Sequence, residues 1–136
     1  MHNVINLNGC DGWMSDTFEC CFTVAGIVYT SVYQYLVCCK AKLNGRKDLL
    51  NRIKHSKSVQ ELQILDKEIE VVDVRYWSEV YTDSKNVATI QKFMCNKCLR
   101  DKLVSTDYSR KYKVVGGKID FSTLRSVQFI MSMEDY

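Results

Sequence analysis

The sequence predicts a helix-rich α+β fold in one domain that spans residues 1–136, with short strands near both ends. Its 136 residues match the length of an ordinary single domain, which can bury a core without cross-links. Apolar residues recur at helical spacing through the middle of the chain, whereas β-branched and aromatic runs occur near its ends. An apolar content of 46% with a net charge of only +3 excludes a disordered chain.

Short strands are expected at both ends of the chain. Residues 4–7 alternate weakly between apolar and polar side chains, as a half-buried strand does. Residues 18–22 and 26–30 are rich in β-branched and aromatic side chains and are separated by a small-residue turn, which predicts a hairpin. A second hairpin is expected where residues 112–115 and 118–119 flank two glycines.

Helical periodicity begins after residue 30. The spacing of Val32, Leu36 and Leu43 predicts a helix, and the Asn44-Gly45 pair ends it. Leucine and isoleucine side chains between residues 49 and 53 predict a second, short helix. Three further segments of the chain are also expected to be helical.

A capping box, Ser58 with Glu61 three residues later, predicts the start of the third helix. Residues 73–81 and 87–103 have the apolar spacing of two more helices. A last helix is expected to begin at Asp120 or Ser122 and to reach residue 131.

Charge and composition exclude several function classes. The 19 basic and 16 acidic residues are interspersed, whereas a duplex nucleic-acid binder needs a more basic, clustered face. No apolar run is long enough to span a bilayer, and no secretory signal is visible, so we expect a soluble, cytoplasmic protein without a membrane partner. The seven cysteines are then expected to be reduced thiols.

The sequence predicts neither a metal site nor a cofactor. Cys95 and Cys98 have the spacing of half a zinc site or of a redox pair, but no second pair has matching spacing. Their expected place inside a long helix also argues against a redox role, so we interpret them as idle thiols. His2 and His55 lie in polar stretches far from any partner, which indicates surface histidines.

Two residues are candidates for chemistry. Lys40 follows Tyr33 by seven positions, which places both on one helical face about 10 Å apart. A lysine among apolar neighbours would be partly desolvated and could act as an amine nucleophile; the alternative is a lysine with its stem on apolar surface and its head in water. Trp77 is either a core residue or a stacking platform for a base or nicotinamide-like ring.

Several segments of the sequence are informative through their order and spacing along the chain. They are residues 14–18, 26–29 and 32–40, then residues 52–53 and 58–62, then Trp77, and last residues 92–106. In order and spacing these segments, over residues 14–107, resemble the NADAR family, the YbiA-like domains associated with NAD and ADP-ribose metabolism. The resemblance implies N-glycosidic chemistry, because known members hydrolyse a ribose–amine bond of riboflavin-pathway intermediates or remove ADP-ribose from guanine.

The resemblance also implies a set of site residues. Lys40 and Trp77 match the lysine and tryptophan of the family's site, but Tyr33 stands where the family has glutamate. Asp16 replaces an asparagine, and Asp120 lacks the Trp-Gly that follows the family's late aspartate. Lys40 is therefore the candidate catalytic residue, and the candidate ligand-binding residues are Ser15, Asp16, Phe18, Tyr33, Trp77 and Asp120.

Two functions compete on these grounds. Loss of a general acid or base costs a factor of about 100 to 10,000 in rate but does not affect binding, so we expect a module that holds an ADP-ribose-containing nucleotide uncleaved. Such a chain would suit a phage anti-defence protein that sequesters an ADP-ribose-type immune signal in the host cytoplasm, a setting that the sequence itself does not show. The alternative is an active N-glycosidase in which Lys40 forms a Schiff base with the ribose and Asp16 or another carboxylate replaces the glutamate. A third possibility is a protein-interaction domain on the same scaffold.

Overall fold

The computed structural model describes residues 3–56 and 58–134, so His2 lies outside the described residues. The helices are α1 (Val32–Leu43), α2 (Leu50–Lys54), α3 (Val59–Glu68), α4 (Val74–Met94), α5 (Lys97–Ser105) and α6 (Phe121–Glu134). The strands are β1 (Val4–Asn6), β2 (Phe22–Val24), β3 (Ile27–Tyr29) and β4 (Lys113–Val115). Two 3₁₀ turns, η1 (Gly12–Met14) and η2 (Lys47–Leu49), complete the elements. The predicted helix-rich α+β class is confirmed.

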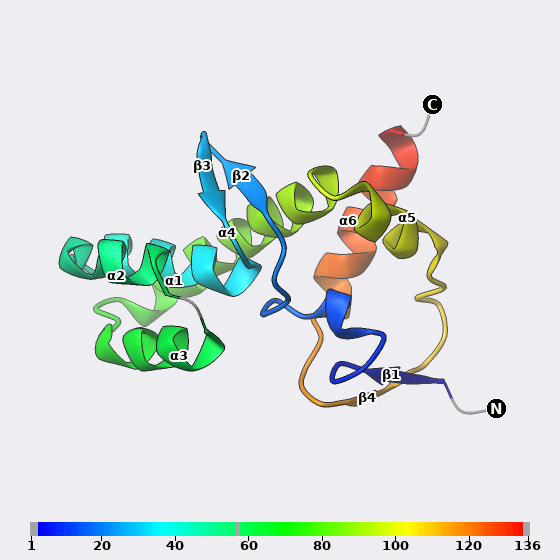
Figure 1. Cartoon of the computed structure of the whole chain (residues 1–136), viewed down its shortest axis with the longest axis horizontal. Helices are drawn as coiled ribbons and strands as arrows, with labels where there is room; N and C mark the ends of the chain where they lie inside the picture. Colours follow the sequence, from blue (N-terminus) through cyan, green and yellow to red (C-terminus); the bar gives the residue numbers. More distant parts are fainter. Residues whose placement is uncertain (1–2, 57, 135–136) are drawn as a thin grey trace.

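Helix α4 joins two halves of the molecule. In Figure 1 it runs between α1, α2 and α3 on one side and α5, α6, β1 and β4 on the other. Each half has its own apolar cluster: Ala88 of α4 belongs to the first and Phe93 of α4 to the second. Because one helix is packed into both clusters, it fixes the position of one half relative to the other.

The first predicted hairpin is confirmed. β2 and β3 pair antiparallel, with Phe22 opposite Tyr29. The turn between them places Ala25 at φ 51° and Gly26 at φ 78°, in the left-handed region. The first strand starts at Phe22 instead of Phe18: residues 18–21 form no strand, although the N–H of Cys20 donates to the carbonyl of Thr30 at 2.8 Å.

The second predicted hairpin is wrong. β4 pairs in parallel with β1, so that Val4 lies opposite Lys113, and residues 118–119 form no strand. Gly116 and Gly117 have φ values of 88° and 152° and lead the chain on towards α6 instead of back along β4. The physical reason is that the partner of β4 comes from the other end of the chain, which a local turn pattern does not reveal.

The predicted helix starts are largely correct. The hydroxyls of Ser31 and Ser58 accept hydrogen bonds from the backbone N–H groups of Gln34 and Glu61, at 3.0 and 3.1 Å. The carboxylate of Asp120 does the same for the N–H of Thr123 at 3.1 Å, at the start of α6.

One helix boundary was predicted in the wrong place. Segments 73–81 and 87–103 are not two helices with a gap at residues 82–86; α4 runs through that gap and ends at Met94. The break comes at Asn96, whose side-chain amide donates to the carbonyls of Cys21 (3.0 Å) and Lys92 (2.8 Å). These side-chain bonds compete with continued helix, so α5 begins anew at Lys97.

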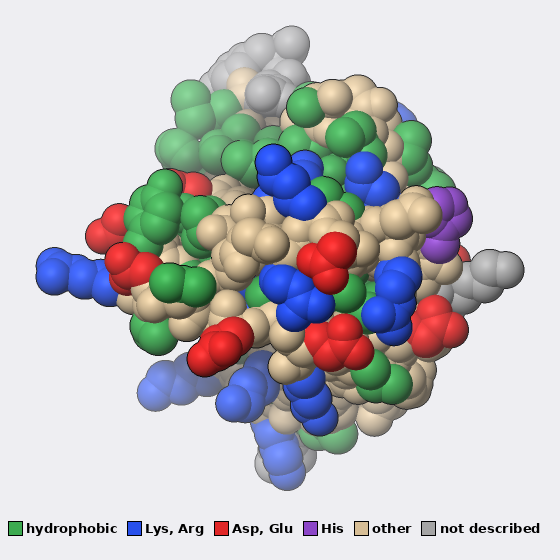
Figure 2. Space-filling view, turned by 90° about the vertical axis from the view of Figure 1, so that its left-hand side faces the viewer, with side chains coloured by type: hydrophobic (Ala, Val, Ile, Leu, Met, Phe, Trp, Pro, Cys, Tyr) green, Lys and Arg blue, Asp and Glu red, His purple; other side chains and the backbone are tan. Residues whose placement is uncertain are grey.

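The surface carries mixed charge on the face built by α1, α2 and α3. Figure 2 shows Lys and Arg side chains interspersed with Asp and Glu side chains across this face, without a continuous basic area. No helix among the described residues is both long and apolar enough to cross a membrane.

Candidate functional site

Four of the predicted site residues line one pocket. The pocket lies between α1, α3, α4 and the segment after η1, and has a volume of about 210 Å³. Its lining consists of Asp16, Tyr33, Leu36, Val37, Lys40, Asp66, Trp77 and Tyr81. Thus four candidates from three separate segments of the sequence, Asp16, Tyr33, Lys40 and Trp77, meet at one place.

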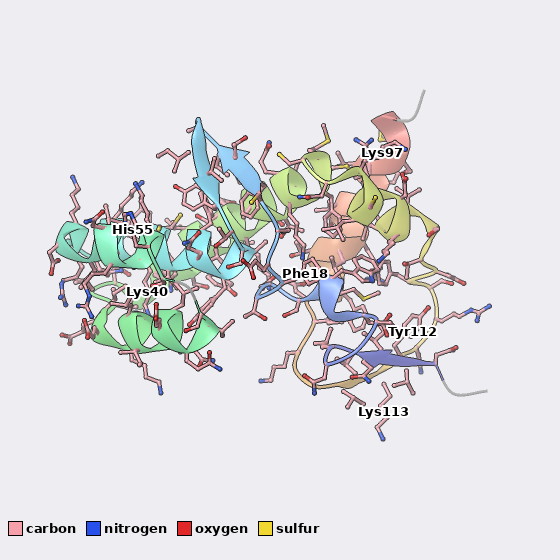
Figure 3. All side chains as sticks on the ribbon, viewed as in Figure 1. Phe18, Lys40, His55, Lys97, Tyr112 and Lys113 are labelled. Atoms are coloured by element: carbon pink, nitrogen blue, oxygen red, sulfur yellow. The ribbon has the colours of Figure 1, made fainter. Side chains whose placement is uncertain are left out.

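Asp66 links the two residues that α1 contributes. Its carboxylate accepts a hydrogen bond from Lys40 Nζ at 2.7 Å on Oδ1 and one from the Tyr33 hydroxyl at 2.9 Å on Oδ2. Lys40 Nζ also donates to the backbone carbonyl of Asp66 at 3.1 Å, and Figure 3 shows Lys40 beside α3. Burial, together with the hydrogen bond to Asp66, raises the pKa of Tyr33, so its hydroxyl remains a donor at neutral pH.

The wall opposite α1 is aromatic. Trp77 and Tyr81 lie one turn apart on α4, and their rings meet edge to face with centroids 5.7 Å apart. Trp77 is partly exposed and belongs to neither buried cluster. Of the two interpretations of Trp77, this placement favours the stacking platform over the core residue.

The next turn of α4 carries a lysine that holds Asp16. Lys85 Nζ lies 3.1 Å from the Asp16 carboxylate and 3.4 Å from the Asp120 carboxylate. Burial acts to lower the pKa of Lys85, but the carboxylate of Asp16, the hydroxyl of Tyr81 and the carboxylate of Asp120 outweigh it and raise that pKa. Asp120 therefore lies next to Asp16 and helps to line a small neighbouring cavity, but not the main pocket.

A buried lysine anchors the segment that carries Asp16. Lys92 Nζ donates to the carbonyls of Trp13 (2.7 Å) and Ser15 (3.0 Å), and Lys92 is only 2% exposed. Burial lowers the pKa of Lys92 to about 8. The backbone carbonyl of Asp16 also accepts from the N–H of Tyr33 at 2.9 Å, so this segment is fixed to both α4 and α1.

Two predicted residues lie away from the pocket lining. The Ser15 hydroxyl is 2.9 Å from that of Thr17. Phe18 packs against the second apolar cluster, with Lys92 Nζ 5.6 Å from its ring, and Figure 3 shows it far from Lys40. Both residues belong to the segment that positions Asp16.

Sequence reasoning missed Asp66, Tyr81, Lys85 and Lys92. Tyr81 and Lys85 follow Trp77 at intervals of four residues, so their position on its helical face could have been recognised. Asp66 is a polar residue in the last turn of an amphipathic helix, and only the packing of α3 against α1 brings it to Lys40. Lys92 has the sequence context of an ordinary surface lysine.

The remaining candidates for chemistry are apart from this pocket. Cys95 and Cys98 are exposed free thiols, at the end of α4 and in α5. Within the described residues, no three or more His, Cys, Asp or Glu side chains are arranged to hold a metal ion. His55 is exposed, with Nδ1 2.7 Å from the carbonyl of Asn51.

The helices around two short sheets, with a lysine-containing pocket beside α4, define a domain of the YbiA-like fold. The NMR structure of the E. coli protein YbiA is similar with a TM-score of 0.76, covering 98% of this chain and 88% of that chain at 17% identity. No family model matches the sequence, and no curated protein matches it. The likeness establishes the fold, and the roles of single residues rest on the geometry given above.

A Tyr33→Phe substitution is expected to lower the free energy of unfolding by about 1 kcal/mol, because it removes one partly buried hydrogen bond to Asp66. The Lys40–Asp66 pair remains. Urea unfolding measures the change, and Tyr76→Phe, at an exposed tyrosine of α4, is the matched control. Equal stability of the two variants would show that the Tyr33–Asp66 bond contributes nothing.

Proposed function

We propose that this chain binds an ADP-ribose-containing nucleotide in the pocket and holds it without cleaving it. The observation that carries the proposal is the pairing of Lys40 with Asp66 inside a pocket with an aromatic wall. An amine nucleophile must be unprotonated and free to approach carbon. Lys40 Nζ instead makes two hydrogen bonds to Asp66, which favours a binding role over an attacking one.

The dimensions of the pocket fit part of a nucleotide. A volume of about 210 Å³ is below the roughly 300–1,000 Å³ of sites that enclose whole drug-sized ligands. The pocket would therefore take one ring and its ribose, while the rest of the nucleotide lies along the surface. Trp77 and Tyr81 offer faces and edges for an aromatic ring.

The proposal extends to a setting in which binding without turnover would be useful. A protein that binds without turnover sequesters at most one small molecule per binding site. A phage anti-defence protein could act in this way on an ADP-ribose-type immune signal in the host cytoplasm. The mixed charge of the face in Figure 2 accords with a small-molecule partner instead of duplex nucleic acid.

The test is a thermal-shift series with ADP-ribose, NAD⁺ and cyclic ADP-ribose. A ligand at 100 times its Kd adds about 2.7 kcal/mol to the free energy of unfolding. The stabilised complex is then denatured, and the released molecule is identified by chromatography and mass. Intact ligand is the expected result. Cleaved ligand would establish an enzyme, and no shift with any of the three would leave the interaction-domain hypothesis.

An active N-glycosidase is the second candidate, and one observation favours it. The Asp66 carboxylate, 2.7 Å from Lys40 Nζ, is placed to take the proton of that amine, so a carboxylate from α3 could replace the glutamate that the family has at position 33. The amine would attack ribose C1′, and the base would leave with the electrons of its bond to C1′ and with one proton of the amine. The C1′–O4′ bond would then open, with the second amine proton going to O4′, and the ribose would remain as a Schiff base. Borohydride reduction followed by mass spectrometry detects such an adduct. An adduct on Lys40 that is absent from Lys40→Met would replace the binding proposal.

A further inference from the structure

The pocket exposes its carboxylates more than its ammonium groups. Its charged lining residues are Asp16, Asp66 and Lys40, which sum to a net charge of −1. Lys85 lies outside the lining and pairs with Asp16 and Asp120. The side chains of Asp16 and Asp66 are 35% and 30% exposed, whereas those of Lys40 and Lys85 are 17% and 12% exposed. An entering ligand therefore meets the carboxylates first.

The aromatic wall has the same preference for positive charge. The faces of aromatic rings carry negative potential and attract cations within about 6 Å. Lys85 Nζ lies 5.8 Å from the ring centre of Tyr81, so one ring of this wall already faces a cation. Trp77 is the neighbouring ring, and both rings line the pocket.

Among the described residues, this lining offers a phosphate no cation that is not already paired. Lys40 is the one basic side chain among the lining residues, and its hydrogen bonds go to Asp66. A phosphate at Lys40 would have to break a 2.7 Å ion pair and then lie beside the freed carboxylate. The charged phosphates of a nucleotide are therefore expected outside the pocket.

We propose that the pocket receives the cationic N-ribosylpyridinium end of its ligand, with the ring against Trp77 and Tyr81 and its positive charge near Asp16 and Asp66. The proposal rests on the proposed function, from which it takes the N-ribosyl ligand, and adds the charge of the ring. Among ADP-ribose-containing nucleotides, NAD⁺ has such a ring, whereas NADH and ADP-ribose do not.

The test compares nicotinamide riboside with its freshly reduced dihydro form. The two probes have the same shape apart from one added hydride, differ by one positive charge and carry no phosphate. Titration calorimetry at fixed pH and salt is expected to give at least about 10-fold tighter binding of the cation, equivalent to 1.4 kcal/mol. NAD⁺ and NADH repeat the comparison with the phosphates attached.

Two variants assign the preference to the pocket. Asp16→Asn removes one exposed carboxylate, while Asp120 remains as a partner of Lys85, so the variant is expected to fold. Its preference for the cation is expected to fall about threefold or more. Asp83→Asn changes an exposed carboxylate of α4 outside the lining and is expected to leave the preference unchanged. Thermal unfolding of both variants checks their folding.

The outcomes separate this inference from the proposed function. Equal binding of the oxidised and reduced probes, or ADP-ribose binding as tightly as NAD⁺, would overturn the preference for a cation and leave nucleotide binding standing. A preference that Asp83→Asn reduces as much as Asp16→Asn would also overturn it, since the cause would then be overall charge. No binding of any probe would remove both proposals.

Discussion

Raising the pH from 7 to 10.5 is expected to increase the free energy of unfolding by about 3 kcal/mol relative to a Lys92→Met variant. Lys92 is buried and donates to two backbone carbonyls. Burial lowers its pKa from 10.5 to about 8. The charged form of Lys92 therefore lowers the free energy of unfolding, and this destabilisation is lost when the lysine is neutral.

The direction of the effect follows from proton binding. Below pH 8 both the folded and the unfolded chain carry the proton on Lys92. In this range Lys92 therefore does not make the free energy of unfolding depend on pH. Between pH 8 and 10.5 the unfolded chain binds a proton that the folded chain has released, so stability rises with pH. Above pH 10.5 both states are neutral and the gain is complete.

Urea unfolding at several pH values measures this difference. The comparison is made in a Cys20→Ser background, because Cys20 interacts with Lys92 and burial raises the pKa of its thiol. Lys97→Met is the matched control, since Lys97 is an exposed lysine at the start of α5. If the difference in the free energy of unfolding between wild type and Lys92→Met stays constant from pH 7 to 10.5, the pKa of Lys92 is not lowered by burial and the account of this residue is contradicted.

A Trp77→Ala substitution is expected to weaken nucleotide binding about 10- to 100-fold, because stacking on an aromatic side chain contributes about 1–3 kcal/mol per base. The partly exposed indole belongs to neither core cluster, so the variant is expected to fold. Calorimetric titration with NAD⁺ measures the affinity, and circular dichroism measures the fold.

Tyr76→Ala is the matched control for this prediction. Tyr76 is the preceding residue of α4, it is 52% exposed, and it does not line the pocket. An equal loss of affinity in the two variants would show that the effect is not local to the pocket. Loss of the fold in Trp77→Ala would make Trp77 a core residue and remove the stacking role.

Local signals in the sequence predicted part of this site. The seven-residue interval between Tyr33 and Lys40 predicts a shared helical face, and Asp66 indeed bonds to both side chains. The Ser58 cap marked the start of α3 because its hydrogen bond spans only three residues. The resemblance to YbiA-like domains correctly predicted the fold.

Other features depend on contacts between distant segments and have no local signal. The carbonyls that Lys92 binds lie more than seventy residues before it in the chain. The parallel pairing of β1 with β4 likewise joins the two ends of the chain, which is why a local hairpin was predicted in its place. Asp66 reaches Lys40 only through the packing of α3 against α1.

The central claim, that the pocket beside Lys40 is the ligand site, has a direct test in the two tryptophans of the chain. Trp77 lines the pocket, whereas Trp13 is buried in the second apolar cluster. The two indole N–H signals in a ¹H–¹⁵N spectrum are assigned with Trp77→Phe and followed during titration with NAD⁺. The account predicts that the Trp77 signal moves to saturation while that of Trp13 stays in place. A stationary Trp77 signal in the presence of a bound nucleotide would contradict it.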